Sequence, residues 1–160
     1  MALGDMFLKI DGTRSGPIKG ESTDAAHGGE IDVLSWSWGM RAGSAMGGAG
    51  GAAKTSLDSL MVSKRVDAAS TALMSVMRNN ELLKKAVLTV RKSGNNPIEY
   101  LLITLENARI TSYDVATNPE TPYLLDEKLS FSFEKISVDY YPQDDKGARK
   151  GGSNFTAQTN

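Results

Sequence analysis

The chain contains no cysteine and only one histidine, His27, among its 160 residues. The absence of cysteine excludes disulfides, thiolate catalysis and cysteine-ligated zinc or iron–sulfur clusters. A serine–histidine triad or a histidine-rich metal site would have to use His27, which lies in the turn-like sequence AAHGG without a second ligand at metal spacing. We therefore interpret His27 as a solvated loop residue and expect no catalytic residue, metal or cofactor.

The chain also lacks an excess of charge and a long apolar run. Its 18 basic and 19 acidic residues give a net charge of −1. That balance disfavours nucleic acids and anionic membranes as partners, because both are bound through excess lysine and arginine. No segment approaches the roughly 20 apolar residues of a membrane helix. The first residues, MALGDMFLKIDG, lack the apolar core of a signal peptide, so we expect no leader.

Alternating polar and apolar residues dominate the rest of the chain and predict β-strands. The predicted strands are Met6–Asp11, a strand-like segment Thr55–Val66, Ala86–Lys92, Ile98–Tyr113, and a last strand from Tyr123 to Pro142. In the last strand, one phase is shared by Leu129, Phe131 and Phe133, and the other by Ile136, Val138 and Tyr140. This change of face near Glu134 predicts a bulge or a corner between two sheets.

One segment has a helical period instead. Its apolar stripe consists of Ala69, Leu73, Val76 and Met77. Asp67 is a suitable N-cap and the pair of asparagines at 79–80 a suitable end, which predicts a helix over about residues 68–78.

Taken together, these elements predict a mainly β fold, either a small β-barrel or two packed sheets, with one flanking helix. We expect one domain over residues 1–145, with a turn at Gly94–Pro97 and a loop at Asp114–Pro122. The polar residues 146–160 predict a flexible tail.

The stretch EIDVLSWSWGMRAG contains the only two tryptophans of the chain. Its even positions from Leu34 to Met40 are large and apolar, while the odd positions 35 and 37 are serines, so the pattern predicts a strand with one buried face. An exposed tryptophan platform for sugars or bases would not need apolar neighbours on the same face. We therefore expect a core built from Leu34, Trp36, Trp38, Phe131 and Phe133.

The next segment, Gly43–Ala53, has five glycines in eleven residues. It does not match the phosphate-binding pattern GxxxxGK[ST], because Lys54 follows Ala53 and the next segment is a predicted strand rather than a helix. Its composition predicts either a flexible loop or an arm that becomes ordered against a neighbouring subunit.

Five short motifs in order resemble the Hcp family, the tube proteins of bacterial type VI secretion systems. They are KGES, EIDVLSWSWG, LTVRK, EYLLITL and a closing YYPQ, and the resemblance covers about residues 5–145. It implies a fold like that of phage tail-tube proteins and hexameric rings that stack into a tube. It also implies a contractile sheath, a VgrG spike and effector proteins held in the channel as partners. A family member stays in the bacterial cytoplasm until the machine fires it out of the cell.

The resemblance also suggests roles for particular residues. A channel that admits varied cargo should be lined by small side chains, and we expect Ser35, Ser37, Ser130 and Ser132 to face it. The arm that reaches a neighbouring subunit or ring should be formed by Gly43, Ser44, Met46, Gly47, Gly48, Gly50 and Gly51.

Two other classes remain as alternatives. A monomeric β-barrel carrier of a ligand such as a lipid would need an apolar cavity, whereas the aromatic residues predict a filled core. An enzyme is disfavoured by the single histidine and the missing cysteine.

Overall fold

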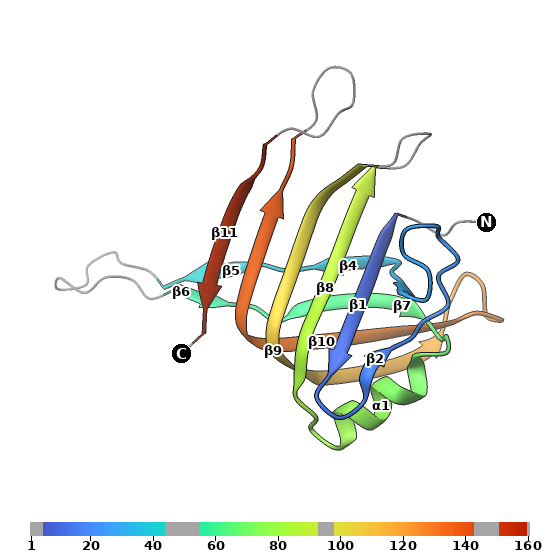
Figure 1. Cartoon of the computed structure of the whole chain (residues 1–160). Helices are drawn as coiled ribbons and strands as arrows, with labels where there is room; N and C mark the ends of the chain where they lie inside the picture. The colour runs from blue at the N-terminus through green and yellow to red at the C-terminus, as the bar shows by residue number, and fades with distance from the viewer. Residues whose placement is uncertain (1–4, 44–54, 93–97, 143–150, 160) are drawn as a thin grey trace.

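A computed structural model describes residues 5–43, 55–92, 98–142 and 151–159, which form eleven strands and one helix (Figure 1). The elements are β1 (Met6–Gly12), β2 (Gly16–Ile18), β3 (Ile31–Asp32), β4 (Ser35–Ser37), β5 (Met40–Ala42), β6 (Thr55–Leu57), β7 (Leu60–Arg65), α1 (Ser70–Arg78), β8 (Leu83–Lys92), β9 (Ile98–Thr117), β10 (Leu125–Tyr140) and β11 (Ser153–Gln158). The predicted mainly β class with one flanking helix is confirmed.

Nine of the strands form one antiparallel sheet that bends over itself into two layers (Figure 1). The long strands β9 and β10 belong to both layers. We call the first layer the upright sheet; it contains β1, β8, β11 and the parts of β9 and β10 that pair with them, residues 98–106 and 135–140. The second, the crossing sheet, contains β4, β7 and residues 108–117 and 125–133 of the same long strands.

The corner between the layers lies at Glu134, as the change of phase predicted. Phe133 pairs with Ala108 and Lys135 with Glu106, so Glu134 and Asn107 lie at the bend. Asn107 adopts a left-handed backbone conformation (φ +52°), and its Nδ2 donates a hydrogen bond of 2.9 Å to Glu134 Oε2. Because asparagine tolerates this conformation better than most residues, it suits a sharp turn within a continuous strand.

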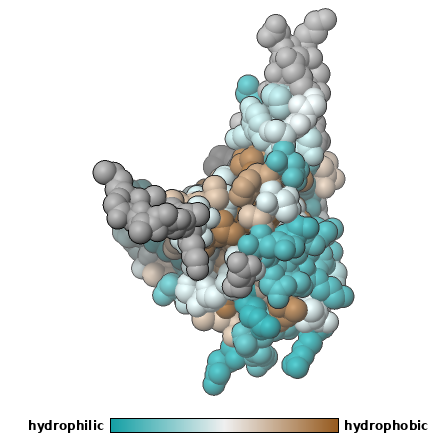
Figure 2. Space-filling model, turned by 90° about the vertical axis from the view of Figure 1, so that its left-hand side faces the viewer, coloured by the Kyte–Doolittle hydropathy of each residue, from teal (hydrophilic) through white to brown (hydrophobic). Residues whose placement is uncertain are grey.

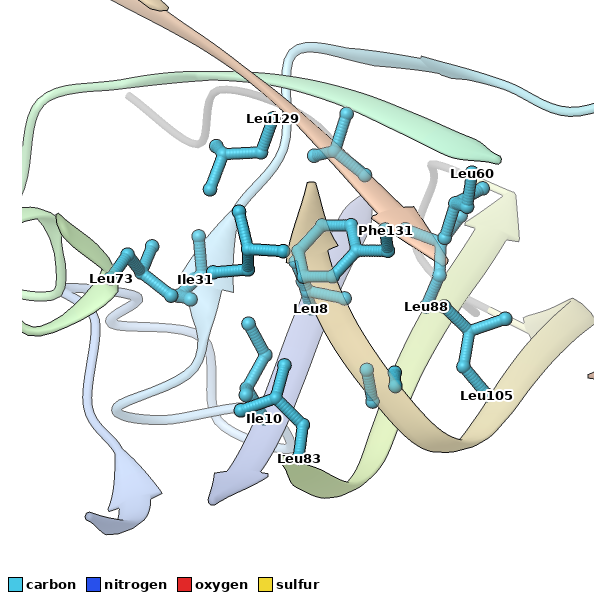
Figure 3. Close-up of a cluster of buried hydrophobic side chains, with 14 of the residues drawn as sticks. Leu8, Ile10, Ile31, Leu60, Leu73, Leu83, Leu88, Leu105, Leu129 and Phe131 are labelled. Carbon is cyan, nitrogen blue, oxygen red and sulfur yellow. The ribbon is translucent and has the colours of Figure 1, made fainter. Parts of the chain in front are cut away.

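The core fills the space between the two sheets (Figure 3). Phe131 and Phe133 are buried in it, but Leu34, Trp36 and Trp38 are only half-buried. The reason is a change of sheet within the stretch that was predicted as one strand: β3 pairs with β1, whereas β4 pairs with β7. Trp36 and Trp38 therefore lie at the margin of the core, where the Trp38 Nε1–H donates to the Asp58 carbonyl at 2.9 Å.

The helix α1 begins at Ser70, two residues later than predicted, and ends at Arg78 as expected. Its N-cap is Ala69, which has no side-chain capping bond; Asp67 instead accepts a bond of 2.9 Å from the Ala69 N–H through Oδ1 and organises the turn before the helix. The helix buries Ser70, Leu73 and Val76 and contacts β9, so it covers one open end of the space between the sheets.

Other boundaries also differ from the sequence predictions. β9 continues to Thr117, which removes the first residues of the predicted loop. The tail predicted to be flexible contains β11, which pairs with residues 135–140 of β10. The predicted Gly94–Pro97 turn and the arm residues Ser44, Met46, Gly47, Gly48, Gly50 and Gly51 lie outside the described residues, while Gly43 is exposed at the end of β5.

Candidate assembly surface

The register of the crossing sheet places most of the predicted channel residues on one outward face. In antiparallel sheets, directly paired residues lie on the same face. Ser37 pairs with Met61, Met61 with Ser130, and Ser130 with Ser112. A second row joins Ser35, Ser63 and Lys128. We call this surface the serine face: Ser35, Ser37, Met61, Ser63, Ser112, Lys128, Ser130 and Ser132.

The serine face is shallow and consists mostly of small side chains. Its centre holds a depression of about 190 Å³, lined by residues that include Ser35, Ser37 and Met61. Ser35 and Ser37 are exposed, while Ser130 and Ser132 are half-buried. Sequence reasoning did not assign Met61 and Lys128 to this surface. The structure shows that Met61 alternates with the buried Leu60 and Val62 and therefore points to the opposite face.

Both margins of the crossing sheet are open among the described residues. β4 pairs only with β7 there, and beyond Ala108 β9 pairs only with β10. Such unpaired N–H and C=O groups are positions at which another chain can add a strand. The two open margins lie on opposite sides of the serine face.

A buried charge network supports this sheet from the inside. Lys64 and Glu127 are 0% exposed, pair across β7 and β10, and are in direct contact through Nζ and Oε1. Lys64 Nζ also donates to Asp67 Oδ1 at 2.9 Å, and Ser70 Oγ donates to Glu127 Oε1 at 2.7 Å. The network therefore ties the start of α1 to the crossing sheet.

Tyr113 of β9 completes the network. Its hydroxyl donates to Glu127 Oε2. Burial, together with the hydrogen bond to the carboxylate, raises the pKa of Tyr113 well above its ordinary value. The phenol therefore stays protonated and remains a donor over the physiological pH range.

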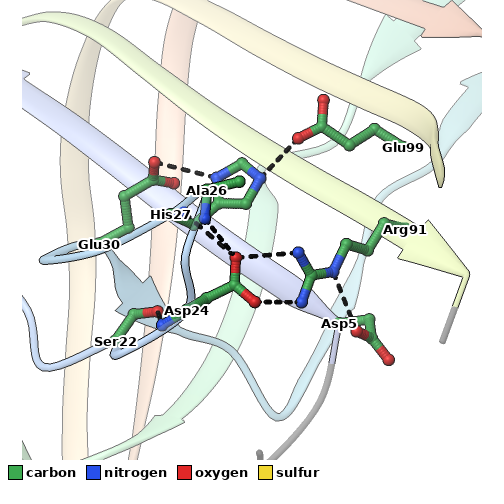
Figure 4. A network of polar contacts seen from close by, with 8 residues as sticks. All are labelled: Asp5, Ser22, Asp24, Ala26, His27, Glu30, Arg91 and Glu99. Atoms are coloured by element: carbon green, nitrogen blue, oxygen red, sulfur yellow. Dashed lines mark hydrogen bonds and ion pairs between the residues drawn. The ribbon is translucent and has the colours of Figure 1, made fainter. Parts of the chain in front are cut away.

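His27 is not a solvated loop residue, so that prediction is wrong. Its side chain is buried, and its ring stacks on Phe7 with a centroid distance of 4.5 Å (Figure 4). Nδ1 lies 3.0 Å from Glu30 Oε2, and Nε2 lies 2.5 Å from Glu99 Oε1. These contacts fasten the loop between β2 and β3 onto the outer side of the upright sheet.

Arg91 of β8 forms a second set of contacts that holds the same loop against the upright sheet (Figure 4). Its guanidinium donates to both oxygens of Asp24 and, through Nε, to Asp5 Oδ1 at 3.0 Å. It also lies over the Phe7 ring, 4.8 Å from the centroid. The hydrogen bond to Arg91 lowers the pKa of Asp24 to about 2, and the same contact raises the pKa of Arg91.

Gly20, in the KGES motif, allows this loop to approach β3 closely. A Cβ at Gly20 would lie 2.6 Å from the Glu30 carbonyl oxygen and 2.8 Å from the Ile31 Cα. Both are backbone atoms, so the motif needs a residue without a side chain at this position.

Comparison with known proteins identifies the family. The family model described as "Type VI secretion system effector, Hcp" matches residues 7–140. The chain belongs to the Hcp family. It is 41% identical over 151 residues to "Protein hcp1" of Pseudomonas aeruginosa strain PAO1, an alignment that covers 92% of this chain and 90% of that protein.

Solved structures agree with this assignment. The crystal structure of a type VI secretion system effector from Yersinia pestis matches with a TM-score of 0.76 and 33% identity, covering 97% of this chain and 100% of that one. Hcp1 from Salmonella typhimurium matches with a TM-score of 0.75 and 26% identity, covering 96% and 95%.

Because the chain belongs to the Hcp family, its surfaces can be related to the assembly that Hcp subunits form. Hcp proteins are secreted tube subunits of type VI secretion systems and assemble as hexameric rings. In such a subunit, the surfaces of interest are those that meet other copies and those that line the channel. Within the described ranges, no helix is long and apolar enough to cross a membrane, and no cluster of three potential metal-ligating side chains occurs.

Proposed function

We propose that the serine face lines the channel of the hexameric ring and contacts the effector proteins carried there. The observation that supports this assignment is a pair of cross-strand rows in which serines predominate. One row runs from Ser37 on β4 through Met61 to Ser112 on β9, and the other joins Ser35, Ser63 and Lys128. A wall of short, weakly interacting groups admits different cargoes without binding any of them tightly. Met61 supplies a flexible apolar contact at the centre of this wall.

The open margins of the crossing sheet provide a means of closing the ring. The β4 margin of one copy joins the β9 margin of the next, so each subunit uses two different surfaces. Contacts of this head-to-tail kind generate closed rings when the rotation between copies is suitable. The pairing also covers edges that would otherwise promote aggregation.

The remaining roles follow from the resemblance to the family. The tube acts as a structural element rather than an enzyme, beneath a VgrG spike and inside a contractile sheath. The chain waits in the bacterial cytoplasm and leaves the cell with the machine. The glycine-rich segment 43–53 acts as an arm toward a neighbouring subunit or ring.

Replacing Ser37 with aspartate tests the channel assignment. The hexamer would then carry six added carboxylates on its channel wall, and cargo contacts that place a like charge or an apolar group against a carboxylate are costly. We expect about tenfold less of a co-expressed effector to remain on the purified ring. Retention is measured as the effector-to-tube protein ratio, and ring formation by native mass spectrometry.

Ser137→Asp is the matched control, because Ser137 pairs with Thr156 on the outer side of the upright sheet. This variant should retain effector like the parent. If Ser37→Asp changes neither effector retention nor ring assembly, the serine face does not line the channel.

A further inference from the structure

One row of inward-facing side chains runs across the whole crossing sheet. Trp36 pairs with Val62, and Val62 with Leu129. Leu129 in turn pairs with Tyr113. Directly paired residues lie on the same face, so these four side chains lie on the face opposite the serine face. Val62 and Leu129 are buried, whereas Trp36 and Tyr113 are half-buried. The row therefore ends at each open margin in an aromatic side chain that its own chain covers only in part.

A groove lies beside the β9 margin on this inward face. It has a volume of about 500 Å³ and is lined by Met74, Met77 and Arg78 of α1 and by Tyr113 of β9. Met74 is exposed, and so is Val115, two residues beyond Tyr113 on the same face of β9. Large apolar side chains gathered at one exposed place mark an interaction surface more often than scattered ones do. The groove is thus an apolar site next to an unpaired part of a strand.

The tryptophan at the other margin cannot fill this groove within one chain. Neighbouring strands lie about 4.8 Å apart, so the three strand spacings between β4 and β9 separate Trp36 from Tyr113 by roughly 14 Å. Among the described residues, none accepts a hydrogen bond from the Trp36 indole N–H, although such groups usually find a partner when they are buried. Trp36 is therefore available for contacts with a neighbouring copy.

Trp38, the other tryptophan, is held by its own chain. Its indole N–H donates to the Asp58 carbonyl at 2.9 Å, and its ring centroid lies 6.5 Å from that of Phe155 on β11. β11 and the β5–β6 hairpin lie at one end of the molecule (Figure 1). Figure 2 looks onto this end and shows apolar side chains gathered in a hollow between more hydrophilic surfaces. Trp38 thus has its partners within its own subunit, which makes it a matched control for Trp36.

We propose that Trp36 of one copy occupies the groove between α1 and β9 of the next copy in the ring. The inference rests on the proposed function, in which the β4 margin of one copy joins the β9 margin of the next. β4 is three residues long, and Trp36 is its one inward-facing side chain. When β4 adds to β9, the pleat continues across the contact. Trp36 then lies on the α1 side of the sheet, beside Tyr113 or one inward-facing position away from it.

The lining of the groove suits an indole ring. The thioethers of Met74 and Met77 are flexible and polarizable, so they adapt to a flat aromatic side chain. Arg78 has no ion-pair partner among the described residues. A guanidinium at the face of a tryptophan adds a cation–π attraction. Ring closure then buries one aromatic side chain at each of the six contacts, and such buried aromatics commonly dominate the stability of an interface.

Dissociation of the ring on dilution tests this contact. Trp36→Leu keeps an apolar side chain against the core but is too short to fill the groove, and Met74→Asp places a carboxylate in the groove. Each should raise the concentration at which half of the rings have dissociated by about tenfold or more, as measured by native mass spectrometry. Trp38→Leu and Ser75→Asp are the matched controls, because Ser75 is exposed on the same helix without lining the groove. Both controls should dissociate like the parent.

The double variant, Trp36→Leu with Met74→Asp, identifies the occupant of the groove. If the two side chains touch across the interface, the second substitution removes an interaction that the first has already lost. The dissociation midpoint of the double variant should then lie within about threefold of that of the weaker single variant. Independent effects would instead multiply to about a hundredfold relative to the parent.

Three outcomes overturn the proposal. Multiplied effects would mean that the groove receives something other than Trp36, and rings unaffected by either substitution would mean that ring closure leaves the groove open. An equal loss of rings from the controls would mean that the effect is not specific to the groove. Circular dichroism separates ring loss from unfolding, and Trp36→Phe takes the place of Trp36→Leu if that variant does not fold. Failure of the proposed function is distinguishable, because the parent protein would then form no hexamer.

Discussion

Replacing Lys64 with alanine should lower the free energy of unfolding by about 3–5 kcal/mol, the largest loss we expect from a single substitution. Lys64 and Glu127 are both fully buried, so the substitution would leave a buried carboxyl group without its main partner. The hydrogen bonds from Ser70 and Tyr113 would remain but could not replace the lost ion pair. Denaturant unfolding followed by circular dichroism measures the loss.

A double variant separates the loss of stability caused by breaking the ion pair from the net contribution of the intact ion pair to stability. Lys64→Met with Glu127→Leu replaces both charges by apolar side chains of similar volume, and should recover most of the lost stability. A loss below about 1 kcal/mol for Lys64→Ala would contradict the burial of this pair, since exposed ion pairs contribute about that much or less.

Replacing Arg91 with alanine should have the second-largest effect, a loss of about 2 kcal/mol at neutral pH. The substitution removes hydrogen bonds to Asp24 and Asp5 and the contact with the Phe7 ring. The expected loss is smaller than for Lys64 because both carboxylates are about one-fifth exposed and partly screened by water. Arg91→Lys is the control, because it keeps the charge but not the paired hydrogen bonds.

The effect of Arg91 should also depend on pH. The pKa of Asp24 falls from an ordinary 3.8 to about 2 in the folded protein. A lowered carboxyl pKa stabilises the fold above the unfolded value, and that contribution is lost as the pH falls through the folded value. The stability difference between the parent and Arg91→Ala should therefore shrink between about pH 4 and pH 2. A difference that stays constant over this window would contradict the pairing with Asp24.

Periodicity predicted the general fold because each long strand buries one phase at a time. The corner at Glu134 was found because Phe133 and Ile136 fall on opposite phases, and a continuous strand cannot bury both on one face. A similar change of phase occurs where the buried Ile31 and Val33 give way to Trp36. That stretch was predicted as one strand, although it passes from the upright to the crossing sheet at Leu34.

Residues whose environment depends on distant partners could not be placed from the sequence. Lys64 alternates in phase with Leu60 and Val62, but only the fold brings Glu127 beside it, 63 residues away. His27 gave no signal at all, since Glu99 lies 72 residues further along the chain. Alternation within a single strand, in contrast, shows which residues share a face. Ser35 and Ser37, and separately Ser130 and Ser132, could therefore be assigned to one face of their strands before the strands were paired.

Native mass spectrometry of the intact protein tests the central claim most directly, because a tube subunit must close into rings. We predict a predominant species with six times the mass of the 17.1 kDa chain, stable at micromolar concentration. A protein that remains monomeric or dimeric under these conditions would contradict the assignment of the serine face and of the two open sheet margins to a ring.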